Sequence, residues 1–225
     1  MNVKSGIAEI QGHISKYNCR LVAVSKTYPI EAIMEAYEAG QRDFGENKVQ
    51  EMVPKFEALP KDIRWHMIGH LQSNKVKYIA HFVHLIHSVD SFKLLSEINK
   101  EAVKNNRVIS CLLQMHIAEE ETKYGFDESE LFSLLDSPEF NKLNNIKVVG
   151  LMGMATFTDD KEKIKAEFSS IKSTFDVLKS KYPSDSKISM LELSIGMSND
   201  FLIACEQGST MVRIGTSIFG KRDYK

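Results

Sequence analysis

One lysine, Lys26, has the sequence context of a reactive amine. It follows the apolar segment Arg20–Ser25, which contains β-branched residues and has the composition of a buried strand. A lysine at the end of such a strand lies at the carboxyl edge of the sheet, where α/β folds place their chemistry. A partly desolvated amine loses some of its preference for the charged form and can form a Schiff base. The alternative is a lysine that simply reaches solvent, because lysine side chains are mostly exposed.

Two glycine-containing segments near the C-terminus have the composition of a phosphate site. Ser194–Asp200 follows one apolar run, and Arg213–Gly220 follows the next. Glycine lets the backbone approach an anion closely, and a Ser or Thr hydroxyl adds a hydrogen bond. We expect Ser198 also to cap the helix after it, so that the helix N-terminus faces the phosphate. Either loop alone is a weak signal, because glycines and hydroxyls are common in turns.

The elements that must position these residues alternate along the whole chain. Eight apolar strand candidates, separated by amphipathic helix candidates, predict an α/β protein with a (β/α)8 TIM barrel. The first and eighth strands are neighbours in such a barrel, so we expect Lys26 to lie beside the Arg213–Thr216 loop. The strand candidates are Arg20–Ser25, Asp43–Gly45, Arg64–Ile68, Val83–His87, Val108–His116, Lys147–Met154, Ser189–Ser194 and Thr210–Ile214. The helix candidates are Ile30–Ala39, Lys48–Leu59, Ser73–Ile79, Ser91–Asn105, Ser129–Leu135, Lys161–Lys181 and Asp200–Gln207.

Length and composition are those of one globular domain. The 225 residues are 43% hydrophobic and 26% charged, with no Pro-, Gly- or Ser-rich linker, and we predict a single domain over residues 1–225. The formal net charge of −1 gives no electrostatic reason to expect nucleic acid or a membrane as a partner. There is no membrane-spanning apolar stretch and no signal-peptide core, so we expect a cytoplasmic protein.

The cysteines and histidines form no convincing metal or disulfide pattern. Cys19, Cys111 and Cys205 are odd in number and widely spaced. His66 and His70 have i, i+4 spacing, but a strand end rather than a helix face separates them. We therefore expect no metal ligands.

Six motifs in fixed order resemble those of the pyridoxal 5′-phosphate (PLP) homeostasis proteins, also called the YggS/PROSC family. The resemblance covers about residues 22–224 and implies a barrel like the N-terminal domain of alanine racemase, with PLP as cofactor. Met67 and Ile195 differ from residues that the family often carries, but both keep hydrophobic character. The motifs are Val22–Thr27, Phe44–Asn47, Trp65–Lys75, Gly150–Met152, Leu193–Asp200 and Val212–Gly220.

The same resemblance implies roles for individual residues. Lys26 is implied to hold PLP as an internal aldimine, and Asn47 to lie beside the ring. Arg213 is implied to be the partner of the pyridine nitrogen. The implied phosphate ligands are Ser198, Gly215 and Thr216.

Arg213 also bears on whether the protein is an enzyme. A protonated arginine can only donate to the pyridine nitrogen, which leaves the ring a poor electron sink and argues against transamination. Racemase-like chemistry stays open, because Lys26 can serve one face of a substrate α-carbon. Alanine racemase takes its second base, a tyrosine, through a second domain and a dimer interface. Nothing in the sequence places Tyr28 or Tyr78 there.

We therefore expect a monomeric PLP-binding protein that carries or regulates the cofactor and releases it to PLP-dependent client enzymes. The resemblance implies no established turnover, so we assign no catalytic residue. Three alternatives stay open: a PLP-dependent amino-acid racemase or decarboxylase, a Schiff-base aldolase without cofactor, and an interaction protein with a vestigial site. Residues 119–126, after the fifth strand, are expected to be a solvated loop, with a lid over the site as the alternative.

Overall fold

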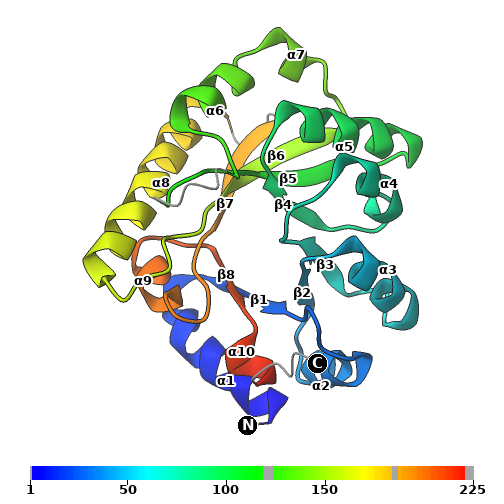
Figure 1. Cartoon of the computed structure of the whole chain (residues 1–225), viewed down its shortest axis with the longest axis vertical. Helices are drawn as coiled ribbons and strands as arrows, with labels where there is room; N and C mark the ends of the chain where they lie inside the picture. Colours follow the sequence, from blue (N-terminus) through cyan, green and yellow to red (C-terminus); the bar gives the residue numbers. More distant parts are fainter. Residues whose placement is uncertain (1, 119–123, 184–186, 221–225) are drawn as a thin grey trace.

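The chain folds into a closed barrel of parallel strands surrounded by helices (Figure 1). The computed structural model describes residues 2–118, 124–183 and 187–220. Each strand pairs with the next one in sequence, and β8 pairs with β1, so the predicted (β/α)8 architecture is confirmed. The strands are β1 (Arg20–Val24), β2 (Asp43–Glu46), β3 (Arg64–Met67), β4 (Leu85–Val89), β5 (Ile109–Gln114), β6 (Ile146–Met152), β7 (Ile188–Ser194) and β8 (Met211–Ile214).

Helices connect the strands on the outside of the barrel (Figure 1). Those expected from the sequence are present, and α1, α7 and α10 were not expected. None of the helices in the described ranges is long and apolar enough to cross a membrane. The α-helices are α1 (Val3–Ile14), α2 (Ile30–Glu38), α3 (Val49–Ala58), α4 (Val76–Ile79), α5 (Phe92–Lys104), α6 (Glu128–Leu135), α7 (Pro138–Asn141), α8 (Lys161–Lys181), α9 (Phe201–Glu206) and α10 (Thr216–Phe219). The short 3-10 turns are η1 (Ser15–Tyr17) and η2 (Ser73–Lys75).

Local sequence signals explain where several helices begin and end. The Ser91 side chain accepts a hydrogen bond from the backbone N–H of Leu94 and caps α5. Gly40 has a φ of 95° after the end of α2, a conformation that favours glycine. Helix α8 ends one residue before Tyr182, and Pro183 follows it.

The barrel interior combines an apolar cluster with a buried polar set. Val22, Leu85, Leu112, Val149, Met152 and Met211 form a cluster separate from the main core, which lies between the strands and the helices. Gly45 keeps the interior narrow, since a Cβ there would lie 2.9 Å from Ile68 Cδ1 and 3.1 Å from Val22 Cγ1. The buried polar residues of this interior include Asp43, His66, His87, Ser194 and Arg213.

Helix α1 packs directly on α10, and the two lie side by side in Figure 1. A Cβ at Gly6 would come within 2.8 Å of the Ser217 carbonyl oxygen, so the two backbones meet closely. The buried face of α1 carries Val3, Ile7, Ile10 and Ile14. Because α10 begins at Thr216, the first helix of the chain supports the end of the last strand.

Candidate functional site

A cavity of about 230 Å³ lies at the carboxyl ends of the strands. It brings together Lys26, two residues after the end of β1, the segment after β2 and both C-terminal loops. All six residues singled out from the sequence line it, namely Lys26, Asn47, Ser198, Arg213, Gly215 and Thr216. The expectation that Lys26 lies beside the Arg213–Thr216 loop is therefore confirmed.

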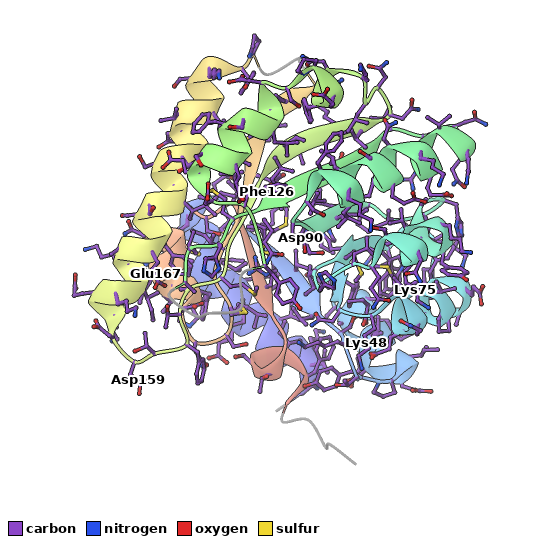
Figure 2. All side chains as sticks on the ribbon, turned by 45° about the horizontal axis from the view of Figure 1, so that its top comes forward. Lys48, Lys75, Asp90, Phe126, Asp159 and Glu167 are labelled. Carbon is purple, nitrogen blue, oxygen red and sulfur yellow. The ribbon has the colours of Figure 1, made fainter. Side chains whose placement is uncertain are left out.

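Further cavities adjoin this one around the barrel mouth. One of about 480 Å³ shares Ser198 and Thr216 with it, and another of about 240 Å³ shares Asn47. Lys48 and Lys75 line the 240 Å³ cavity, and Figure 2 shows them on the other side of the molecule from Glu167 of α8. A larger cavity of about 680 Å³ lies between α5 and α6, and its walls include none of the six residues. The 230 Å³ cavity is the candidate site, because the six residues singled out from the sequence converge there.

The backbone on both sides of Lys26 is fixed by charged side chains of α3. The carbonyl oxygen of Ser25 accepts a hydrogen bond of 2.9 Å from Lys55 Nζ. The N–H of Thr27 donates one of 2.8 Å to Glu51. Thr27 has a φ of 68°, which is unusual for a β-branched residue and costs on the order of 1–3 kcal/mol. The surrounding contacts therefore hold a strained backbone next to the lysine.

A buried ion pair supports the same strand end from the helix side. Lys55 Nζ lies 2.7 Å from Glu46 Oε1, and the Ser25 hydroxyl donates to that same oxygen at 2.6 Å. Burial raises the pKa of Glu46, and the charge of Lys55 opposes this rise. Sequence reasoning missed this pair, because neither residue has a distinctive motif of its own.

Asn47 is positioned by a close approach of the next loop. A Cβ at Gly69 would lie 2.6 Å from the Asn47 carbonyl oxygen and 2.9 Å from its Cβ. Only glycine fits there without moving the backbone. The signal was present in the sequence, since Gly69 lies in the motif around Trp65–Lys75, but its role needed the structure.

Arg213 is a buried cation with fixed hydrogen bonds. Its Nη1 donates to the carbonyl oxygen and the hydroxyl of Ser194, both at 2.6 Å, and Nη2 donates to the Gly153 carbonyl oxygen at 3.0 Å. Burial lowers the pKa of Arg213 to about 10, and the charge of Asp200 opposes this change. The side chain therefore stays protonated near neutral pH.

The expected cap at Ser198 is wrong. Helix α9 has Asp200 as its N-cap residue, and the Asp200 carboxylate accepts a hydrogen bond of 2.5 Å from the Met197 N–H. The chain turns at Gly196, whose φ is 91°, so Ser198 falls in the turn before the helix. Ser198 still lines the cavity, and Thr216 begins α10 directly after Gly215.

The two tyrosines considered as second bases do not line the cavity. The Tyr28 hydroxyl donates to the Gly220 carbonyl oxygen at 2.6 Å, and Tyr78 lies half-exposed on α4. Residues 119–123 of the loop considered as a lid lie outside the described residues. The described end of that loop is held to β5, because Gln114 Nε2 donates to the Tyr124 carbonyl oxygen at 3.1 Å.

A group of possible metal ligands lies at the opposite end of the barrel. Donor atoms of Asp43, His66 and His84 lie within 4.8 Å of one another. Arg64 donates to both carboxylate oxygens of Asp43, at 2.7 and 2.5 Å. A guanidinium in that place repels a divalent cation, so the site is poorly suited to a metal.

Comparisons with known proteins match nearly the whole chain. The family described as alanine racemase, N-terminal domain, matches residues 2–223. A pyridoxal phosphate homeostasis protein of Aquifex aeolicus is 43% identical over 209 residues, which cover 92% of this chain and 89% of that protein. The human pyridoxal phosphate homeostasis protein is 37% identical over 234 residues, which cover 99% of this chain and 83% of the human one.

Solved structures with the same fold include a close relative with cofactor. PipY of Synechococcus elongatus, with PLP bound, has a TM-score of 0.86 and 34% identity, and the match covers 97% of this chain and 100% of PipY. Alanine racemase of Bartonella henselae has a TM-score of 0.70 at 15% identity, over 98% of this chain and 60% of the racemase. The racemase supports the fold alone.

Proposed function

Because the chain belongs to the pyridoxal phosphate homeostasis protein family, we propose that it binds PLP through Lys26 and acts in PLP homeostasis. One observation carries the proposal. A lysine from the first strand, a buried arginine from the last strand and two glycine- and hydroxyl-containing loops meet in a single cavity. Few ligands need an amine, a cation and a phosphate cradle at the same time, and PLP is one that does.

The donor set of the cavity fits each part of this cofactor. When bound, PLP supplies an aldehyde that condenses with an amine, and an electron-withdrawing ring. The amine is that of Lys26. The hydroxyls of Ser198 and Thr216 and the backbone around Gly215 suit a phosphate, because glycine lets the chain approach an anion closely. Asn47 also lines the cavity, and it borders the neighbouring 240 Å³ cavity as well.

Arg213 supports a binding role rather than transamination. A guanidinium that is charged at neutral pH can donate to a ring nitrogen but cannot accept its proton. Its bonds to Ser194 and Gly153 hold it in this state. With Tyr28 bonded to Gly220, neither tyrosine considered as a second base reaches the cavity. We therefore propose that the protein carries or regulates PLP and releases it to PLP-dependent client enzymes, as a monomer.

Reductive trapping tests this function directly. We expect the protein mixed with PLP to become yellow, and borohydride to fix the cofactor on the peptide that contains Lys26. Lys48→Ala is the matched control, because Lys48 lines the neighbouring cavity, and it should be labelled as the wild type is. Lys26→Ala should not be labelled. Label on another lysine would contradict the role of Lys26, and no uptake of PLP would contradict the whole proposal and favour an aldolase or an interaction protein.

A second measurement separates the carrier from an enzyme. The PLP-loaded protein is incubated in deuterated water with a panel of amino acids, and exchange of the α-proton is followed by NMR. We expect no stereospecific exchange faster than that of free PLP. Rapid stereospecific exchange with one amino acid would identify a racemase-like enzyme instead.

A further inference from the structure

A continuous series of hydrogen bonds crosses the barrel interior from Arg213 to Asp43. Ser194 Oγ accepts from Arg213 Nη1 at 2.6 Å and lies 3.0 Å from His87 Nδ1. His87 Nε2 lies 2.9 Å from His66 Nδ1, and His66 Nε2 lies 2.9 Å from Asp43 Oδ1. None of the five residues is more than 7% exposed. We call this series the Arg213–Asp43 chain.

The proton positions can be assigned from the Asp43 end. Arg64 donates to both oxygens of this carboxylate, and the hydrogen bonds of Arg64 and His66 hold the pKa of Asp43 below its usual range. Asp43 is therefore ionised and can only accept, so His66 must carry its proton on Nε2. Burial lowers the pKa of His66, which leaves its Nδ1 without a proton.

The remaining positions follow one after another. The unprotonated Nδ1 of His66 requires a proton on Nε2 of His87. Burial also lowers the pKa of His87, so its Nδ1 is free to accept the hydroxyl proton of Ser194. The Ser194 oxygen then accepts from Arg213. Every donor in the chain points the same way, from the cation toward the carboxylate.

We propose that His87 and His66, anchored by Asp43, are positioning residues that fix Arg213 as the donor to the ring nitrogen of PLP. The inference rests on the proposed function. Arg213 lines the cofactor cavity, whereas Asp43 is paired with Arg64 at the other end of the barrel. A Ser194 hydroxyl that is committed to His87 has to offer its lone pairs to Arg213. The guanidinium therefore keeps one orientation.

A merely structural role accounts poorly for this arrangement. Apolar side chains such as Leu85, Leu112 and Met152 fill another part of the barrel interior. Buried polar networks are often no more stabilising than well-packed apolar residues of similar volume, because desolvation offsets the gain from hydrogen bonding. Because the Arg213–Asp43 chain ends at the cofactor cavity, it can position a ligand-binding group as well as fill space.

The charges around the two imidazoles favour their neutral form. Burial and the charges of Arg20 and Arg64 lower the pKa of His66, and the Asp43 carboxylate on β2 opposes this change. The ring of His84 packs against that of His66. Arg213 faces His87 across Ser194, and the charges of Arg213 and Arg20 lower the pKa of His87 further. A proton added to His87 would place a second positive charge beside Arg213.

The first test needs no cofactor. Nitrogen-15 NMR of the histidine side chains in the protein without PLP should show a proton on Nε2 and none on Nδ1 for both His66 and His87. The two N–H protons should exchange slowly with solvent, as buried donors do. The opposite tautomer at either residue would overturn the proposal, whether or not PLP binds.

The second test compares variants of the PLP-loaded protein by absorption spectroscopy against pH. His87→Leu and Ser194→Ala should each move the pH midpoint of the cofactor band by about one unit and raise the PLP dissociation constant about tenfold. Leu112→Ala is the control, because Leu112 is buried in the barrel interior but is not part of the Arg213–Asp43 chain. It should lower the melting temperature and leave the band unchanged.

A conservative variant separates positioning from packing. In His87→Asn the side-chain oxygen can still accept from Ser194, but the contact with His66 is lost, so the spectrum should lie between those of His87→Leu and the wild type. If His87→Leu binds PLP with the wild-type spectrum and pH midpoint, the positioning role is wrong. A wild-type protein that takes up no PLP would remove the proposed function and this role together, while the NMR result would still decide whether the Arg213–Asp43 chain exists.

Discussion

The hydroxyl of Tyr28 donates a hydrogen bond of 2.6 Å to the carbonyl oxygen of Gly220 and so joins the segment after Lys26 to the end of α10. The Tyr28 ring also packs against Phe219, with centroids 4.8 Å apart. Lys26 and the Arg213–Gly220 segment come from opposite ends of the sequence, and the Tyr28 side chain fixes one relative to the other. Because the two segments are already fixed, the protein loses little conformational entropy when a ligand that contacts both binds.

Replacing Tyr28 by Phe tests this link. The variant keeps the ring but loses the donor to Gly220, a hydrogen bond of about 1 kcal/mol. We expect the PLP dissociation constant, measured by fluorescence titration, to rise about fivefold. Tyr37→Phe is the control, since Tyr37 donates to Asp62 on the exposed surface. Equal affinities for all three proteins would show that the link does not contribute to binding.

Replacing Gly69 by Ala should displace Asn47. The new Cβ would lie 2.6 Å from the Asn47 carbonyl oxygen, and relieving that overlap costs roughly 1–3 kcal/mol of unfolding free energy. Urea unfolding and PLP titration should both show losses. At Gly12, on α1, a Cβ meets no atom within 4 Å, so Gly12→Ala should instead stabilise the protein by up to about 1 kcal/mol. An unaltered PLP affinity in Gly69→Ala would mean that Asn47 does not contact the cofactor.

Replacing Gly6 by Ala should weaken PLP binding, although Gly6 does not line the cavity. A methyl group there would meet the Ser217 carbonyl oxygen at 2.8 Å and push α10 away from α1. Because Thr216 begins α10, we expect weaker PLP retention in dialysis as well as a lower melting temperature. Gly12→Ala, on the same helix, again serves as the control. A lower melting temperature with full PLP retention would show that the packing of α1 does not affect PLP binding.

Acid should destabilise the protein partly through Asp43. Its pKa is lower in the folded state than the ordinary value of 3.8, so the unfolded state takes up the proton first as the pH falls. The stabilisation is therefore complete above that value and is lost progressively below it. In Asp43→Asn the free energy of unfolding should be lower at neutral pH and should fall less steeply below about pH 4. Asp62→Asn, at an exposed ion pair, should change the pH profile much less. Parallel profiles for Asp43→Asn and wild type would contradict this account.

Much of the fold could be predicted from local sequence. Runs such as Arg20–Ser25 and Lys147–Met154 are apolar and bounded by polar segments, and the structure has a strand at each of them. Helix α1 was missed because its charged residues hid the spacing of Val3, Ile7 and Ile10, which is helical. The cap at Ser198 was wrong because a turn at Gly196 delays the start of α9.

The residues that support the site could not be predicted from the sequence. His66 and His87 lie on different strands, and their contact depends on the strand register and on which side chains point inward. A shift of one residue would turn either imidazole to the other face of the sheet. The close contact of Gly69 with Asn47 depends in the same way on loop geometry.

The pairing of β1 with β8 determines when the site can exist. During synthesis Lys26 leaves the ribosome long before β8, which carries Arg213, and the cavity that both residues line cannot form until β8 docks. A ligand held by both Lys26 and Arg213, as we propose for PLP, can therefore bind only the complete barrel. Such a ligand stabilises the folded protein by mass action and does not stabilise nascent chains that lack β8.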